Sequence, residues 1–335
     1  EMKTQLLKFS KNNVAVAAEV IKNGGVVAFP TETVYGLGAN AFDARAVEKI
    51  FAAKGRPSDN PLIVHVCRKS QIEQIACDLS EDAERIIDGL MPDSLTLVLK
   101  KRSCIPSNVT AGLDTVAVRM PKSREARAFI RACGVPVAAP SANRSGRPSP
   151  TTAEQVAEDM DGRLPIILFG KPCRVGIEST VLDLTGEIPT ILRPGIVPAA
   201  EIERVLSKKV IYLKDDAPAA KLNSPGLRYR HYAPSCEMAL NLDGDREKVL
   251  KRYFEAIEAG KKTVLLCGLE HSERFDGAEL RSLGGSDAEC ARRLFGMLRA
   301  LEKNYDFIIA VWTRKGEVAD SVLNRLLRAA GRNVF

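Results

Sequence analysis

The chain has 335 residues, of which 45% are hydrophobic and 27% charged, and its formal net charge is +7. This composition is typical of a globular protein, and the length suits two ordinary domains. Because there is no apolar run of about 18 residues and no charged-then-apolar leader, we expect neither a membrane span nor a signal peptide. The positive charge suits contact with phosphate, but it fits a nucleic acid, a small nucleotide or a merely solvated surface.

The eight cysteines are scattered along the chain, and no two of them form a C-x-x-C pair. We therefore expect no structural zinc site, and we interpret the thiols as reduced and mostly buried, which indicates the cytoplasm. The run His65-Val66-Cys67 could supply half of a metal site, but no second half lies nearby. A strand is the simpler interpretation, since alternation places both polar groups on one face.

The first 206 residues combine many short apolar runs with a few helical stretches. Helices are predicted over 13–24, 44–54, 80–90 and 151–160. Gly55 ends the second helix, and Thr151 with Glu154 forms a capping box at the start of the fourth. Strands are predicted at 25–30, 61–66, 95–100, 115–120, 135–140, 164–169, 179–184 and 190–195. So many strands with few helices predict an α/β domain built on a mixed twisted sheet, with a broad loop-lined face, over 1–206.

The last hundred residues show a different order of predicted elements. Helices at 245–260, 286–304 and 318–331 alternate with strands at 262–268 and 306–313, and Ser286 with Glu289 forms a second capping box. Such alternation predicts a small doubly wound, Rossmann-like domain with a parallel sheet over 236–335. Residues 207–235 are then a linker between the two domains.

Two of the polar loops in the first domain allow more than one interpretation. Lys54 and Arg56 follow a predicted helix, so they either complement its C-terminus or bind an anion. Residues 140–152 run into a predicted helix N-terminus, where backbone donors favour phosphate. Ordinary N-capping by Ser149 or Thr151 explains the hydroxyls there equally well.

Taken together, the loops and strand ends suggest one cationic cleft. The cations are Lys54, Arg56, Arg119, Arg144, Arg147 and Arg193. The glycines of 29–40 (FPTETVYGLGAN) would let the backbone approach a ligand closely, although a lone G-x-G is weak evidence for a nucleotide. The sequence has no phosphate-loop motif, no complete dinucleotide fingerprint, no G-x-S-x-G and no H-E-x-x-H.

Several blocks, in this order and spacing, resemble the YrdC-like threonylcarbamoyl-AMP synthases. They are FPTETVYGLGANA, KGRP with NPL, LTLVL, VAVRMP, APSAN with PSPT, IESTV and ILRPG. The later blocks SPGLRYRHYAP and LNRLLRAA resemble the long, two-domain form of that family. The resemblance is strong over 25–195 and 224–234 and weak over 240–335.

The resemblance implies a nucleotidyltransferase that makes threonylcarbamoyl-adenylate and pyrophosphate from ATP, L-threonine and bicarbonate or carbon dioxide. Partner proteins would then move the threonylcarbamoyl group onto the adenosine beside the anticodon of tRNA. Mg²⁺ is expected on the ATP phosphates, with waters among its ligands and no direct protein ligand. The alternatives are a YrdC-like carbamoyl-adenylate enzyme and a basic RNA-binding module, and weak RNA binding fits the synthase as well.

The resemblance also assigns site residues. The positions that resemble threonine contacts are Thr33, His65, Arg119, Ala139 through its main chain, and Ser179. Those that resemble ATP contacts are Lys54, Arg56, Asn60, Thr115, Ser141, Asn143, Ser149 and Arg193. Arg119 would hold the substrate carboxylate, and Lys54 and Arg56 the phosphates.

The segment SPGLRYRHYAP, residues 224–234, allows two interpretations. Prolines and a glycine bound a group of aromatic and cationic residues, as in a linker or a lid. A mixed anhydride is destroyed by water, so a cover over the site would protect the product. As a lid, the segment would bring Arg228, Arg230, His231 and Tyr232 to the nucleotide; a plain solvated linker is the alternative.

Overall fold

The computed structural model describes residues 2–213, 231–331 and 333–335. They divide into two compact units. The first unit holds 2–145, 150–174 and 178–213, and the second holds 146–149, 175–177, 231–331 and 333–335. The second unit therefore contains two short segments from the earlier part of the chain as well as the C-terminal third. The predicted domain limits at 206 and 236 stay predictions.

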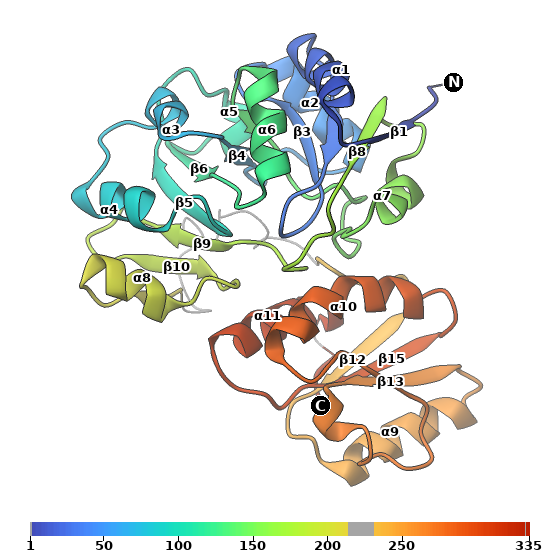
Figure 1. Cartoon of the computed structure of the whole chain (residues 1–335). Helices are drawn as coiled ribbons and strands as arrows, with labels where there is room; N and C mark the ends of the chain where they lie inside the picture. The colour runs from blue at the N-terminus through green and yellow to red at the C-terminus, as the bar shows by residue number, and fades with distance from the viewer. Residues whose placement is uncertain (1, 214–230, 332) are drawn as a thin grey trace. The chain divides into compact units, whose positions relative to one another are not determined.

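The first unit is built on an 11-stranded sheet with the order β1-β8-β2-β3-β7-β4-β6-β5-β9-β10-β11 (Figure 1). Its strands are β1 (Gln5–Lys8), β2 (Val27–Phe29), β3 (Gly36–Asn40), β4 (Ile63–His65), β5 (Leu95–Lys100), β6 (Thr115–Arg119), β7 (Val137–Ala138), β8 (Ile166–Phe169), β9 (Thr180–Asp183), β10 (Thr190–Arg193) and β11 (Ile211–Tyr212). Both parallel pairs, such as β4 with β6, and antiparallel pairs, such as β5 with β6, occur. The predicted mixed α/β sheet is confirmed.

Helices cover the two faces of this sheet unequally. The helices are α1 (Lys11–Lys22), α2 (Ala44–Lys54), α3 (Lys69–Ile75), α4 (Glu81–Leu90), α5 (Ser107–Thr110), α6 (Arg124–Cys133), α7 (Ala153–Met160) and α8 (Ala199–Leu206). Buried residues of α1 and α6 form one apolar cluster with β2, β7 and β8. Buried residues of the other six helices form a larger cluster on the opposite face.

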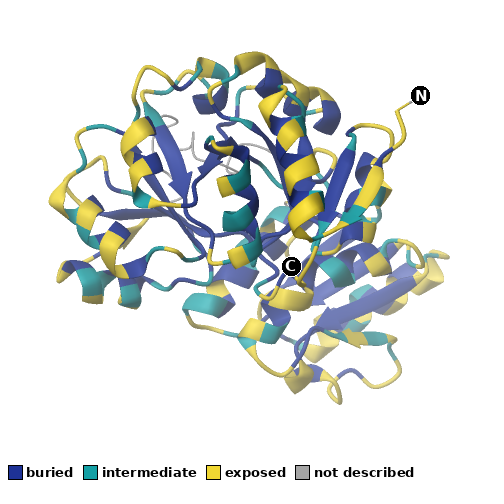
Figure 2. Ribbon diagram, turned by 45° about the horizontal axis from the view of Figure 1, so that its top comes forward, coloured by how far each residue is buried: buried dark blue, intermediate teal, exposed yellow. Residues whose placement is uncertain are grey.

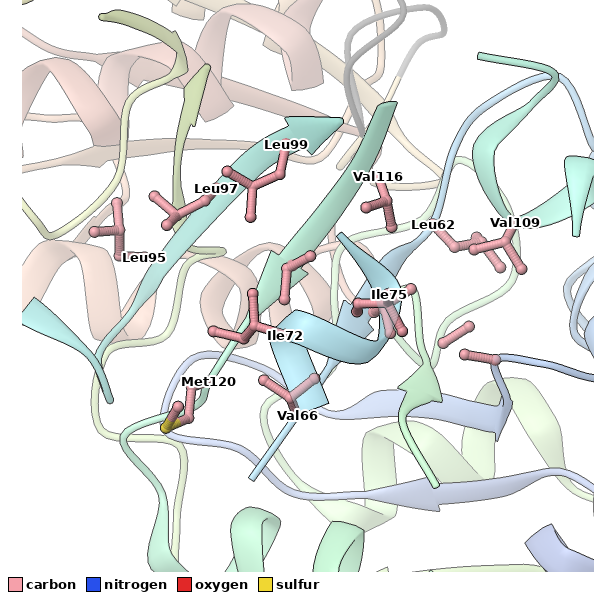
Figure 3. Close-up of a cluster of buried hydrophobic side chains, with 14 of the residues drawn as sticks. Leu62, Val66, Ile72, Ile75, Leu95, Leu97, Leu99, Val109, Val116 and Met120 are labelled. Atoms are coloured by element: carbon pink, nitrogen blue, oxygen red, sulfur yellow. The ribbon is translucent and has the colours of Figure 1, made fainter. Parts of the chain in front are cut away.

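Strand alternation explains which residues join the larger cluster. Leu95, Leu97 and Leu99 of β5 and Val116 of β6 point into it beside Ile72 and Ile75 of α3 (Figure 3). The alternate residues of the same strands must point to the other face, because side chains alternate along a strand. On that face, next to the cluster of α1 and α6, the described residues of β4, β5, β6, β9 and β10 form a small apolar cluster: Ile63, Val98, Ala117, Val181 and Leu192.

The capping residues of two helices can be compared with those predicted from the sequence. Helix α2 begins at the side chain of Asp43, which accepts from two backbone N–H groups, and ends at Gly55 with φ 62°, as predicted. The predicted capping box of Thr151 and Glu154 is wrong. Thr152 is the N-cap of α7, and it accepts from the backbone N–H of Gln155. Sequence alone did not separate two adjacent threonines, each followed three residues later by Glu or Gln.

The second unit contains a four-stranded parallel sheet in the order β12-β15-β13-β14. Its strands are β12 (Glu237–Asn241), β13 (Thr263–Cys267), β14 (Leu280–Ser282) and β15 (Phe307–Val311), and its helices are α9 (Arg246–Glu258), η1 (Leu269–His271), α10 (Asp287–Leu301) and α11 (Glu317–Ala330). Helix α9 lies on one face, and α10 and α11 lie on the other (Figure 1). This confirms the predicted doubly wound, Rossmann-like arrangement. Ser286 caps α10 as predicted, accepting from the N–H of Glu289.

Burial follows this layered plan in both units. The strands are mostly buried, and the helices expose their outward faces (Figure 2).

Five of the eight cysteines are buried, and all eight are free thiols. None of the helices in residues 2–213, 231–331 and 333–335 has both the length and the apolar character needed to cross a bilayer.

Candidate functional site

Three polar side chains form a row across neighbouring strands of the first unit. His65, the last residue of β4, lies in register with Arg119, the last residue of β6. Arg119 in turn lies in register with Thr96 of β5. Paired residues on adjacent strands share a face, so all three lie on the face that carries the small apolar cluster. Thr115, two strand positions before Ala117, shares that face as well.

Glu32 holds the guanidinium of Arg119. Its carboxylate forms an ion pair with Nη2 of Arg119, and only 10% of the Glu32 side chain and 5% of the Arg119 side chain are exposed. The same carboxylate accepts from Oγ of Ser94 at 2.9 Å and from the backbone N–H of Ser123, the N-cap of α6, at 3.1 Å. Nε of Arg119 is buried and has no partner among the described residues. Arg119 can therefore serve a second carboxylate.

The electrostatics of this pair follow from its partners. Burial alone would raise the pKa of Glu32, but the charge and hydrogen bond of Arg119, with backbone N–H donors, outweigh it and lower the pKa to about 2. His65 behaves in the opposite way. Burial, and then the charge of Arg119, lower the pKa of His65 to about 3, so its ring is neutral near pH 7. Its Nδ1 lies 3.1 Å from the carbonyl oxygen of Ile63, so Nδ1 carries the proton and Nε2 keeps a lone pair.

Two buried threonines lie just before Val34, in the loop that follows β2. The hydroxyl of Thr31 donates to the carbonyl oxygen of Val34 at 2.6 Å, so it must accept from the hydroxyl of Thr33 at 2.9 Å. Thr33 thus presents lone pairs rather than a proton. A hydroxyl held in this way suits a substrate amine or hydroxyl as its partner.

Ser179 is linked to the row through Thr96. Their hydroxyl oxygens lie 2.7 Å apart. Arg193, at the end of β10, donates from Nε to the carbonyl oxygen of Ser179 at 3.1 Å and from Nη2 to its hydroxyl at 3.3 Å. The register between β9 and β10 shifts between Ile191 and Arg193, which places Arg193 rather than Leu192 opposite Val181. A bulge of this kind redirects a side chain, here a buried cation beside Ser179.

Lys54 organises the loop that contains Ser141 and Asn143. Its Nζ donates to the carbonyl oxygens of Ser141 and Asn143, the second at 2.7 Å, and the side chain is buried. The backbone carbonyl of Lys54 also accepts from the N–H of Ser145 at 2.9 Å. Of the two interpretations of Lys54, the structure supports a buried cation that holds a loop in place; whether it also faces phosphate stays a prediction.

The remaining predicted residues of the first unit are Arg56, Asn60 and Ala139. Nη2 of Arg56 donates to the carbonyl oxygen of Asn60 at 3.0 Å, and Asn60 is fully buried. The N–H of Ala139 donates to the carbonyl oxygen of Ile63 at 2.9 Å, which fixes the main chain at the end of β7 beside β4. The structure therefore links Ala139 with His65 through the carbonyl oxygen of Ile63, and Arg56 with Asn60.

Some predicted residues belong to the second unit. Ser149 is buried there. Tyr232 is buried and its ring stacks on that of Phe295 in α10, with centroids 5.1 Å apart and planes at 30°. The ring centroid of His231 is 5.7 Å from that of Tyr232. Arg228 and Arg230 lie outside the described residues.

The structure adds residues that sequence reasoning missed. Glu32, Thr31 and Thr96 contact predicted threonine-site residues directly. Ser94 contacts Glu32. Thr96 had a detectable signal, since it is a polar residue in the middle of the apolar run LTLVLK. Glu32 had a weaker one, because nothing in the sequence shows which cation is its partner.

The described residues offer no ready metal site of their own. In 2–213, 231–331 and 333–335, no three His, Cys, Asp or Glu side chains lie close enough together to hold an ion. The hypothesis that His65 and Cys67 form half of a metal site gains no support.

Comparisons with known proteins agree with the geometry. The family model described as "Telomere recombination" matches residues 19–195, and "Threonylcarbamoyl-AMP synthase, C-terminal domain" matches 197–331. The threonylcarbamoyl-AMP synthase of Pyrococcus abyssi is 44% identical over 96% of this chain and 95% of its own, and that of Bacillus subtilis is 42% identical over 99% and 97%. The crystal structure of P. abyssi Sua5 complexed with L-threonine superposes with a TM-score of 0.91 at 41% identity, covering 99% of both chains. The predicted resemblance is confirmed, and the chain belongs to the threonylcarbamoyl-AMP synthase family in its two-domain, Sua5-type form.

Proposed function

We propose that the chain carries out the reaction of its family and forms threonylcarbamoyl-adenylate and pyrophosphate from ATP, L-threonine and bicarbonate or carbon dioxide. The observation that carries this proposal is the buried row of His65, Arg119 and Thr96, with Arg119 held by Glu32. A buried cation on a sheet face is costly unless it serves a partner. In this reaction the natural second partner of Arg119 is the carboxylate of threonine.

The threonine end of the reaction needs an amine that can act as a nucleophile. The amine adds to the carbon source to give a carbamate, and a carbamate oxygen then attacks the α-phosphate of ATP while pyrophosphate leaves. Neutral His65 and the lone pairs of Thr33 add no positive charge that would repel the amine. We assign Thr33, His65, Arg119 and Ser179, with the main chain at Ala139, to the amino acid.

The ATP end needs fixed positive charge, since two anions must be held together. We assign this role to Lys54, Arg56 and Arg193, of which Lys54 and Arg193 are buried. The neutral polar partners that we assign to ATP are Asn60, Thr115, Ser141, Asn143 and Ser149. Positioning and electrostatic stabilisation supply the catalysis, and the reaction requires no covalent enzyme intermediate.

Magnesium and the downstream partners are part of the same proposal. Mg²⁺ would enter with ATP, bound by phosphate oxygens and waters, and neutralise phosphate charge; the residues described assign it no protein ligand. The product is a reactive adenylate, so we place a transferase that modifies tRNA downstream of it, in the cytoplasm. Weak binding of RNA by the basic surface is compatible with that order of events.

The strap at 224–234 stays a prediction as a lid. The described part of it is anchored in the second unit through Tyr232 on Phe295. This anchor supports a strap fixed at its C-terminal end, which is one requirement of a lid hinged there.

The test is an assay of pyrophosphate release with ATP, Mg²⁺, bicarbonate and each amino acid in turn. We expect release that depends on L-threonine and on bicarbonate. Release without any amino acid would contradict the proposal, because the carbamate must form on the amine of threonine. No release with threonine, from protein that is folded by circular dichroism, would contradict the proposal and favour an RNA-binding role.

A further inference from the structure

One face of α10 contacts three separate chain segments of the second unit. Residues 292, 295, 299 and 302 follow each other at spacings of three and four, so they lie along one side of the helix. Residue 292 contacts the segment 175–177, and residue 295 contacts Tyr232. Residues 299 and 302 contact the segment 146–149. Two of these segments come from sequence blocks that the family resemblance connects with substrates.

The first contact is between backbones. Gly176 has φ 85°, and a Cβ atom placed there would lie 2.3 Å from Cα of Arg292 and 2.6 Å from its carbonyl oxygen. Only glycine fits this approach, both because of the positive φ and because the helix backbone cannot give way. The segment that leads to Ser179 therefore runs directly against α10.

The second contact fixes residues 146–149. Arg299, 1% exposed, donates from Nε at 3.1 Å and from Nη2 at 2.7 Å to the carbonyl oxygen of Pro148. Glu302 is equally enclosed, with 3% of its side chain exposed, and it forms an ion pair with Arg147. Its other carboxylate oxygen accepts from the N–H of Ser235 at 2.7 Å. A further bond runs from the N–H of Ala233 to the carbonyl oxygen of Gly146 at 3.0 Å.

The flanks of this segment are fixed independently. The N–H of Ser145 donates to the carbonyl oxygen of Lys54, and the carbonyl oxygen of Pro150 accepts from the N–H of Tyr35, both at 2.9 Å. Lys54 and Tyr35 belong to the first unit. Residues 146–149 are thus a four-residue stretch of the second unit that Arg299 and Glu302 contact from α10 and its C-terminal end.

We infer that Arg299 and Glu302 are positioning residues for the synthase reaction, which hold residues 146–149 in the conformation in which Ser149 meets ATP. This inference rests on the proposed function, because it takes Ser149 as an ATP contact. A segment that is ordered before the ligand arrives binds it more tightly, because no further conformational entropy of the segment is lost on binding.

The experiment compares three variants of the full chain. Arg299→Met keeps the length of the side chain and removes its donors, and Arg299→Lys restores one cationic donor. Arg314→Met is the matched control. Arg314 is a mostly enclosed arginine of the same unit that pairs with Glu270 and Asp287 and donates to the carbonyl oxygens of Gly284 and Gly285. Each variant is assayed for KM for ATP, KM for threonine and kcat, and amide hydrogen exchange is followed in the peptide that covers 144–152.

We expect Arg299→Met to raise KM for ATP by about tenfold or more, with KM for threonine changed less than about twofold. Exchange at Gly146, Arg147 and Ser149 should become faster in the same variant. Arg299→Lys should recover most of the affinity for ATP. Arg314→Met should lower thermal stability but leave both KM values and the exchange of 144–152 as in the wild type.

Two results would overturn the inference. Unchanged exchange in Arg299→Met would show that α10 does not order the segment. Faster exchange with an unchanged KM for ATP, or the same rise in KM in Arg314→Met, would show that its order does not serve nucleotide binding. If the wild type itself releases no pyrophosphate with threonine, the proposed function fails, and the exchange measurements still decide whether α10 holds 146–149.

Discussion

The strands of the two sheets differ in the charged groups that they bury, although Asn241 at the end of β12 is a fully buried neutral polar residue of the second sheet. In the first unit, His65, Thr96, Arg119 and Arg193 are buried and lie within strands or at their last positions. In the second unit, β15 (FIIAV) is entirely apolar, and β13 (TVLLC) is apolar or thiol-bearing apart from its first residue. The fully buried arginines of that unit, Arg299 and Arg325, lie on α10 and α11 instead.

This difference separates a sheet that binds from a sheet that supports. A parallel strand covered by helices on both faces is expected to be apolar throughout, as β15 is. A strand that ends in a buried cation weakens the fold unless an anion compensates for it. In the first unit the buried cation Arg119 lies on the strands that carry the small apolar cluster, and Glu32 compensates for part of its cost in folding free energy.

The largest effect should follow from removing the cation of the row. We expect Arg119→Met to lower kcat/KM for threonine about 1,000-fold, because a charged donor to the substrate carboxylate is lost. It should also destabilise the first unit by about 3–5 kcal/mol, since Glu32 then stays buried without its cation. Steady-state kinetics and thermal unfolding measure the two effects.

A double variant separates the two consequences. Adding Glu32→Gln to Arg119→Met removes the uncompensated charge, so stability should return while activity does not. Recovery of activity together with stability would mean that Arg119 is structural, and the contrast between the two sheets would then carry no functional meaning.

A smaller effect should appear in the pH dependence of stability. The pKa of His65 is lowered to about 3 in the folded chain from an ordinary 6.5, so the unfolded chain binds the proton first as pH falls. Stability from this residue is therefore complete above about pH 6.5 and declines as pH falls towards 3. His65→Gln should show a shallower fall in Tm than the wild type between pH 7 and pH 5.

The chosen range keeps other groups out of the comparison. Glu32, with its pKa lowered to about 2, stays ionised in both states above about pH 5. His271, whose pKa is also lowered by burial, contributes equally to both proteins and cancels in the difference. Identical slopes for the wild type and His65→Gln would show that His65 is not held neutral by its surroundings.

Sequence patterns predicted some parts of this structure much better than others. Strand β5 was predicted with its observed limits, 95–100, because LTLVLK is apolar and β-branched between polar flanks. Strand β3 (GLGAN) was missed, because its glycines are typical of turns. They occur there because a Cβ at Gly38 would lie 2.7 Å from Val137 and 2.9 Å from Phe29. A tertiary contact of this kind leaves no periodic signal.

The candidate site shows the same limit. Arg119 was foreseen at the end of its strand, because the apolar run TVAV stops there. His65 was placed inside a strand that was predicted to continue, whereas β4 ends at His65. The pairing of Glu32 with Arg119 spans 87 residues and depends on sheet order, which local pattern does not encode. The grouping of 146–149 with α10 is a long-range contact of the same type.

The smallest effect tests the contrast itself by making one change in both sheets. Ile63 lies in β4, two residues before His65, and Ile309 lies in the apolar strand β15. Replacing either isoleucine by valine removes one buried methylene and should cost about 1 kcal/mol, seen as a fall in Tm of a few degrees.

Ile309→Val should leave KM for threonine unchanged, because β15 only supports the fold. Ile63→Val should raise it about two- to threefold, since the carbonyl of Ile63 orients both His65 and Ala139, and small displacements of positioning groups weaken binding. Equal effects of the two substitutions on KM would remove the distinction between a binding sheet and a supporting sheet.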